Sequence, residues 1–228
     1  MASRRAGSLG YYSARMPGDV NQGIVVSAGD RNAEIKHRRF RSPGERVDKM
    51  GTIFSIGHST RSWEDFLEVL RAHRIKRIVD VRSIPRSRRN PQFNREVLGK
   101  KLRGARIAYV HSPRLGGLRR ARHDSPNMGW RNTSFRGFAD YMQTREFEAG
   151  LQRLIQLSKH KRSAIMCAEA VPWRCHRSLI GDALTARGVR VGDIMNKTRA
   201  RLHKLTAFAQ VRNKRVTYPD SKPRRRNR

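Results

Sequence analysis

The chain has 228 residues, enough for one domain with a hydrophobic core, and carries a formal net charge of +33. No apolar run is long enough to cross a membrane and no apolar leader lies near the start, so we predict a cytoplasmic protein without membrane contact. Two cysteines are too few for a disulfide framework and fit a reducing compartment.

The two ends of the chain differ in composition from its middle. Residues 1–49 are rich in Arg, Ser and Gly without a sustained period, which predicts a disordered basic extension. Met50 is an alternative natural start, with the preceding residues translated from upstream sequence. A mitochondrial transit peptide is the weaker alternative, because the segment carries acidic residues that such peptides avoid. We predict a single α/β domain over 50–219 and a basic tail over 220–228.

Strand and helix patterns alternate along this domain. Short apolar runs predict five strands, at residues 52–56, 77–81, 107–110, 164–167 and 189–194. Helical spacing of apolar residues predicts helices from Trp63, after Asn94 and Ser134 as capping residues, around Phe147, and over 176–186. Such alternation is typical of right-handed βαβ units, so we predict a mainly parallel five-stranded sheet with helices on both faces.

The fourth strand leads into the segment with the strongest chemical signal. The strand delivers Cys167 to the sheet edge, and a loop with Glu169, Arg174 and Cys175 runs into a helix starting at His176. The N–H groups at a helix start can bind an anion, and the positive end of the helix dipole there favours the thiolate form of a nearby cysteine. The arrangement is distantly similar to the cysteine loops of rhodaneses and cysteine phosphatases. However, the loop lacks their glycines, and the spacing from Cys167 to Arg174 is longer than in phosphatases.

Several side chains in this segment are candidates for catalysis. Glu169 is a candidate general base or nucleophile, and Cys167 is a candidate nucleophile. His58 and His176 complete the predicted catalytic set, because imidazole carries protons near neutral pH. The alternatives are that Cys167 is a buried apolar side chain and that Glu169 orders the loop by pairing with an arginine. Zinc bound by the two cysteines and two histidines is a further alternative. Because their spacing matches no standard zinc motif, we predict no metal and no cofactor.

The other strand ends add supporting residues. Gly57 allows close backbone approach beside His58, and Asp80 lies among apolar residues, so it requires a partner such as an arginine. Tyr109, Gly116, Gly117 and Cys175 are predicted to support the site. Guanidinium groups grip phosphate with two hydrogen bonds, which makes five arginines candidate anion ligands: Arg82, Arg86, Arg88, Arg174 and Arg177.

Together these motifs resemble the domain-of-unknown-function family 488. The motifs are IGHS (56–59), DVR (80–82), PxSR (85–88), LGG (115–117), FADYM (138–142), MCAE (166–169) and CHR (175–177). The resemblance covers about 51–219 and implies a compact α/β domain with a polar site, without a settled reaction. One departure is Asp193, where members of the family typically carry a histidine.

Three functions are compatible with these features. The first is an enzyme acting on a nucleic acid, nucleotide or other phosphate-bearing substrate, with arginines holding phosphate and Glu169 or Cys167 reacting. The second is rhodanese-like sulfur transfer through Cys167. The third is a nucleic-acid-binding protein without catalysis. The basic charge supports polyanion binding in the first and third functions, and GC-rich coding that favours arginine is the alternative source of that charge.

Overall fold

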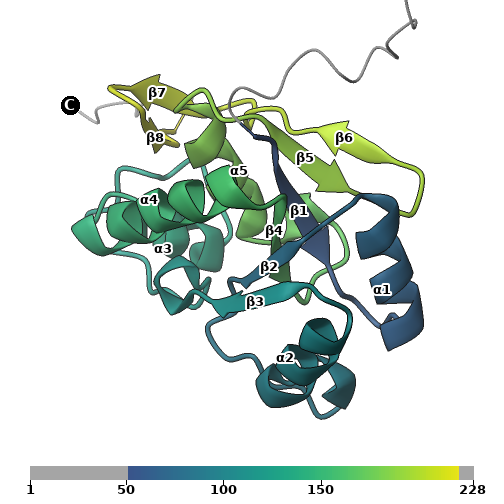
Figure 1. Ribbon diagram of the computed structural model, residues 1–228. Helices are drawn as coiled ribbons and strands as arrows, with labels where there is room; N and C mark the ends of the chain where they lie inside the picture. The colour runs from purple at the N-terminus through teal and green to yellow at the C-terminus, as the bar shows by residue number, and fades with distance from the viewer. Residues whose placement is uncertain (1–50, 221–228) are drawn as a thin grey trace, which may run out of the picture. The chain divides into compact units, whose positions relative to one another are not determined.

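The computed structural model describes residues 51–220, which belong to the second of two units in the chain, residues 43–228. The predicted extension over 1–49 and the tail after Asp220 lie outside the described residues. Six strands form one sheet in the order β3-β2-β4-β1-β5-β6 (Figure 1). They are β1 (Ile53–Gly57), β2 (Arg77–Asp80), β3 (Ala108–His111), β4 (Ser163–Cys167), β5 (Val191–Ile194) and β6 (Ala200–Leu202).

The first five strands are parallel, which confirms the predicted α/β class and its mainly parallel sheet. The sequence missed β6, which pairs antiparallel with β5 at the edge of the sheet. All three residues of β6 are exposed, so the strand carries no burial pattern that a sequence could reveal. A separate antiparallel hairpin follows, formed by β7 (Gln210–Arg212) and β8 (Arg215–Thr217).

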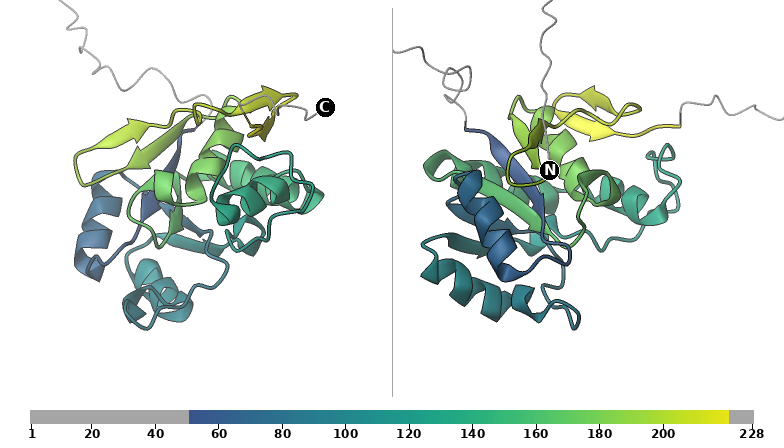
Figure 2. Two further views of the ribbon diagram at one scale, coloured as in Figure 1. Left: turned by 180° about the vertical axis from the view of Figure 1, so that it is seen from behind. Right: turned by 90° about the vertical axis from the view of Figure 1, so that its right-hand side faces the viewer.

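Helices cover both faces of the sheet, as predicted, and Figure 2 shows the two groups on opposite sides. One group is α1 (Trp63–Ala72) and α2 (Arg95–Gly104). The other is α3 (Thr133–Tyr141), α4 (Arg145–His160) and α5 (Arg177–Thr185). Short 3-10 turns are Pro91–Phe93, Pro113–Leu115 and Pro172–Arg174. No helix within 51–220 is long and apolar enough to cross a membrane.

Strand residues alternate between two hydrophobic cores because successive side chains point to opposite faces of a sheet. In β1, Ile53 packs with the α3–α5 group, whereas Phe54 and Ile56 pack with the α1–α2 group. In β4, Ile165 joins the first core and Met166 the second. The central strands are thus buried on both faces, which explains why their sequences are almost entirely apolar.

Helix starts show where local sequence signals were and were not sufficient. Asn132, not the predicted Ser134, caps α3, and its side chain accepts from the N–H groups of Ser134 and Phe135. Asn94 does precede α2, but its side chain accepts from the backbone N–H of Ser87 instead of capping the helix. Capping residues compete with other local acceptors, so a polar residue near a helix start does not fix which group it serves.

The order of the strands places the site. The chain leaves β1 toward the α1 face of the sheet and leaves the neighbouring β4 toward the α5 face. The connections therefore diverge beyond the carboxyl ends of these two strands. Ligands of open α/β sheets bind in the crevice at such a switch point.

Candidate functional site

The loop after β4 is held against the end of β1. The N–H of His58 donates to the carbonyl of Cys167 at 3.0 Å, so pairing continues past the last residue of each strand. Gly57 makes the close approach possible, because a Cβ at this position would lie 1.7 Å from the carbonyl oxygen of Glu169. Only glycine fits here, as the sequence predicted, and the loop backbone is fixed to the sheet as a result.

Arg177 holds the same loop from beneath. It is 1% exposed, and its guanidinium donates to Ser55 Oγ at 2.8 Å and to the carbonyl of Glu169 at 2.5 Å. The sequence predicted Arg177 as an anion ligand. The structure places it under the loop, and it is not one of the residues that line the cavity described below.

A buried network at the end of β2 positions Arg82. Asp80 is fully buried and accepts from Arg82 Nε at 2.9 Å and from a terminal guanidinium nitrogen at 2.6 Å, which confirms the expected arginine partner. Tyr109 donates its hydroxyl to the same carboxylate at 2.8 Å, and burial beside Asp80 raises the pKa of Tyr109. The carbonyl of Phe93 accepts a further bond from Arg82 at 2.8 Å. Arg82 is therefore rigid before any ligand arrives.

His58 completes this network as a neutral ring. Its Nδ1 donates to the carbonyl of Ser59 at 2.8 Å, and its Nε2 accepts from Arg82 at 3.3 Å. Burial, together with the nearby Arg82 cation, lowers the pKa of His58 to about 4. The ring also stacks on Phe93, with centroids 4.1 Å apart. Both ring nitrogens are thus engaged by protein groups in a ring that is uncharged at neutral pH.

Cys167, Cys175 and His176 converge at the start of α5. Both sulfur atoms and a ring nitrogen of His176 lie within 4.8 Å of one another. His176 Nε2 donates to the carbonyl of Val81 at 3.1 Å, which leaves Nδ1 as the acceptor, 3.6 Å from Cys175 Sγ. Gly117 makes room for this ring, since a Cβ there would lie 2.4 Å from Nδ1. The sequence grouped these three residues with His58, which is not part of the cluster.

The two thiols share their protonation unequally. A hydrogen bond from Cys167 to the Cys175 sulfur lowers the pKa of Cys175, and the nearby Arg177 cation acts in the same direction. The same hydrogen bond, together with burial, raises the pKa of Cys167. The electrostatics therefore favour Cys175 as the thiolate of the pair, although the sequence singled out Cys167 as the nucleophile candidate.

These strand ends enclose a cavity of about 740 Å³, within the size range of small-molecule sites. It brings together nine predicted site residues: His58, Arg82, Arg86, Gly117, Cys167, Glu169, Arg174, Cys175 and His176. The sequence missed other lining residues: Ser59, Thr60, Ser83, Ile84, Ser87, Asn90, Leu118, Ser134, Phe135, Ala168 and Ala170. Ser59 and Ser83 follow strand ends, where a signal existed, whereas Ser134 reaches the cavity from α3 through the tertiary fold.

Three charged groups on the cavity wall have no partner among residues 51–220. Arg86, Arg174 and Glu169 are exposed, and their side chains make no hydrogen bond or ion pair within that part of the chain. Glu169 consequently does not pair with Arg82 or Arg177, which was the structural alternative for it. Charged side chains without protein partners on a cavity wall are available to a ligand.

Two predicted residues lie just outside the cavity. Arg88 is exposed on the loop after β2 and is not a lining residue. Gly116 packs against Ser83, whose Oγ would lie 2.5 Å from a Cβ at this position, so it supports the wall from behind.

A second polar network lies further along α5. Asp182 is fully buried and accepts from His203 Nε2 at 3.0 Å, the N–H of Thr206 at 3.0 Å and the hydroxyl of Tyr218 at 2.8 Å. The other ring nitrogen of His203 lies 3.0 Å from a carboxylate oxygen of Asp193. Asp193, the departure from the family pattern, therefore serves an ion pair outside the cavity.

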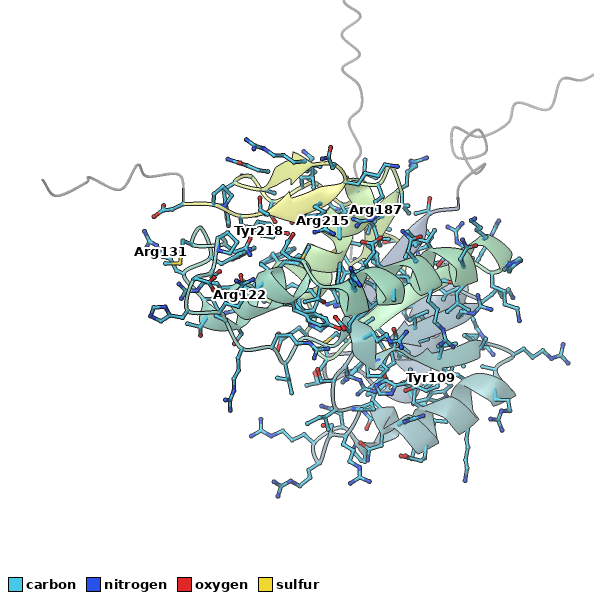
Figure 3. All side chains as sticks on the ribbon, turned by 90° about the vertical axis from the view of Figure 1, so that its left-hand side faces the viewer. Tyr109, Arg122, Arg131, Arg187, Arg215 and Tyr218 are labelled. Atoms are coloured by element: carbon cyan, nitrogen blue, oxygen red, sulfur yellow. The ribbon has the colours of Figure 1, made fainter. Side chains whose placement is uncertain are left out.

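Basic side chains are spread widely over the domain. Figure 3 shows nitrogen-tipped side chains projecting from helices, hairpin and loops across the face turned to the viewer, including the labelled Arg131 and Arg215. Some are neutralised locally, as Arg187 is by Glu148 at 2.5 Å and Arg122 by Asp124 at 2.6 Å. The positive charge is thus not confined to the cavity.

The fold and the site define a doubly wound α/β domain with a cavity at its switch point that both charged and apolar residues line. The family model described as "Domain of unknown function DUF488" matches residues 62–184, from the start of α1 to the end of α5. The chain belongs to that family. Neither the search of curated proteins nor the search of solved structures found a match.

Proposed function

We propose that this protein is an enzyme that binds a nucleic acid, a nucleotide or another phosphate-bearing substrate in the cavity at the β1 and β4 strand ends. One observation carries the proposal. Arg86 and Arg174, both without partners in residues 51–220, share the cavity wall with the unpaired carboxylate of Glu169. Cations to hold an anion and a base to react thus lie on one surface.

The arginines supply the binding half of this proposal. Guanidinium groups without protein partners can form bidentate hydrogen bonds to phosphate oxygens at no cost in broken ion pairs. Arg82 differs because Asp80 and Phe93 already occupy most of its donors. We assign Arg82 a fixed orienting contact, and we assign the gripping of phosphate to Arg86 and Arg174.

Glu169 supplies the reactive half. Its carboxylate is solvent-accessible and unpaired within the described residues, while its backbone is fixed by Arg177 and by the close contact with Gly57. A fixed backbone holds the base near its target atom, and a carboxylate without a structural partner is available to accept a proton. His58 is engaged at both nitrogens, so we assign it the positioning of Arg82 instead of proton transfer.

The charge of the chain favours a polyanionic substrate over a small anion. A formal net charge of +33 attracts nucleic acid and releases its counterions on binding. The sulfurtransferase alternative has weaker support, since the hydrogen bond with Cys175, together with burial, raises the pKa of the Cys167 thiol that would carry sulfur. The cytoplasmic location stays a prediction.

The test follows turnover of defined probes by the full chain. Mass spectrometry would monitor products from a short DNA duplex, a single-stranded RNA and a set of nucleoside triphosphates. Glu169→Gln should lower kcat by about 100-fold or more on the processed probe, because loss of a general base typically costs this much. The control Glu64→Gln alters an exposed carboxylate on α1 and should leave kcat unchanged.

Other results would contradict the proposal in distinct ways. Unchanged turnover in Glu169→Gln would remove Glu169 from the mechanism. Salt-dependent binding of the DNA or RNA without any product would identify a non-catalytic binding protein instead. If no probe is either bound or turned over, the proposal that the substrate carries phosphate is wrong.

A further inference from the structure

Two thiols and one imidazole converge on a single point of the cavity wall, and we propose that Cys167, Cys175 and His176 bind one Zn²⁺ ion there. The three candidate ligand atoms lie within 4.8 Å of one another. Two sulfur ligands and one nitrogen are a donor set that zinc prefers among the common divalent ions. The proposal concerns a metal site and does not depend on the proposed substrate.

The spacing of the ligand atoms fits tetrahedral zinc. With Zn–S of about 2.3 Å and Zn–N of about 2.05 Å, tetrahedral angles separate sulfur from nitrogen by about 3.6 Å and the two sulfurs by about 3.8 Å. The distance from Cys175 Sγ to His176 Nδ1 is 3.6 Å. The second sulfur lies within the 4.8 Å limit of both atoms, so small side-chain rotations complete the geometry.

His176 is oriented as zinc-binding histidines are. Its Nε2 donates to the carbonyl of Val81, which directs the lone pair of Nδ1 toward the thiols. A ligating imidazole characteristically donates its other N–H to a carbonyl or carboxylate in this way. The ring makes an edge-on contact with Phe138, with centroids 5.0 Å apart, and it packs closely against Gly117, which has no Cβ to obstruct it. These two contacts fix the plane of the ring.

The basic surroundings do not oppose this cation. Zinc binds cysteine in its thiolate form, so a thiol that carries a proton releases it on binding. Two thiolates then offset the charge of the dication, so the loaded site adds no net positive charge to its basic surroundings.

The site has three protein ligands and an open side. All three residues line the cavity, so the fourth coordination position faces the space where we place the substrate. Zinc sites with three protein ligands keep that position for water or substrate, whereas structural sites are closed by a fourth side chain. His58, the fourth residue considered in the sequence, is held by Ser59 and Arg82 and does not join the group.

The experiment measures metal in the full chain without any substrate. The protein would be purified under reducing conditions, stripped with a chelator, equilibrated with zinc chloride and desalted. Atomic mass spectrometry should then find about one zinc ion per wild-type chain. Cys175→Ser and His176→Gln should each retain less than about 0.1 zinc ion per chain, because each substitution removes a ligand. The matched control His123→Gln alters an exposed histidine and should keep the full zinc content.

Cobalt substitution gives a readout that does not depend on the variants folding. Wild-type protein loaded with Co²⁺ should show sulfur-to-cobalt charge-transfer absorption and intense tetrahedral bands, which require direct thiolate ligation. Circular dichroism would check the fold of each variant. Lack of bound zinc and of this absorption in the wild type would overturn the proposal. A Cys167–Cys175 disulfide under the same conditions, or full zinc content in His176→Gln, would overturn it equally.

Discussion

The segment between β4 and α5 uses charge in the opposite way to the second half of α5. In that segment, Arg174 and Glu169 lie exposed on a cavity wall without partners in residues 51–220. In the second half of α5, Asp182 is fully buried and accepts three hydrogen bonds, one of them from His203. A buried charge must be paired to be tolerated, whereas an exposed one can remain available. Pairing therefore separates the charges that hold the fold from those that we assign to a ligand.

The largest expected effect tests the buried hydrogen-bond network of Asp182. Asp182→Asn should lower the free energy of unfolding by about 3 kcal/mol or more, because it removes one of the two counter-ions of His203 and weakens a buried acceptor of three hydrogen bonds. Urea denaturation would measure the change. Asp124→Asn, which breaks an exposed ion pair with Arg122, should leave stability unchanged within error. Equal effects of the two variants would show that the buried network contributes nothing beyond a surface pair.

The next effect is the pH dependence of the same network. Burial alone would lower the pKa of His203, but hydrogen bonds to Asp182 and Asp193 outweigh burial and raise it to about 9. Because the folded-state pKa exceeds the ordinary value of 6.5, the stabilisation is complete below pH 6.5 and is lost as pH rises through 9. We expect a loss of about 2–3 kcal/mol over this interval.

The measurement is urea denaturation of the wild type and of His203→Gln at a series of pH values. Glutamine cannot gain a proton, so the variant should be less stable at pH 6 and should show a flatter profile up to pH 9.5. The same slope in both proteins would assign the pH dependence to other groups.

The smallest expected effect tests the unpaired Arg174 on the cavity wall. Arg174→Gln should leave the free energy of unfolding unchanged, since the side chain has no partner within the described residues. For a DNA duplex, the plot of the logarithm of the binding constant against the logarithm of the salt concentration has a negative slope. Arg174→Gln should reduce the magnitude of that slope by about one, because one phosphate contact is lost. Fluorescence anisotropy would measure the slope, with Arg153→Gln on α4 as a control away from the cavity. Identical slopes would place the phosphate contact elsewhere.

Much of the fold could be predicted because the central strands are buried on both faces. Runs such as Ile78-Val79 and Ile165-Met166 are apolar without interruption, and they could be placed from the sequence alone. The edge strand β6 could not, since its residues are all exposed. The β7–β8 hairpin turns through Asn213 and Lys214, both at positive φ. Only Asn213 is a typical turn residue, so the signal was partial.

The site could be predicted in outline for a different reason. The carboxyl ends of parallel strands meet at one edge of a sheet, so residues after each strand, such as His58, Arg82 and Cys167, were expected to converge. Which of them face the cavity could not be predicted. Arg174 and Arg177 are close in sequence, yet one lies on the cavity wall and the other is buried beneath the loop.

The sequence by itself determined the α/β class and the family, and it pointed to the strand ends that carry the candidate site, because hydrophobic periodicity and motif order are local properties. The tertiary structure decided how the charges and thiols are used. Burial paired Asp80 with Arg82 and Asp182 with His203, and the turn of the β4 loop brought Cys175 and His176 to Cys167. These outcomes depend on dielectric and on distances across the fold, which no stretch of sequence contains.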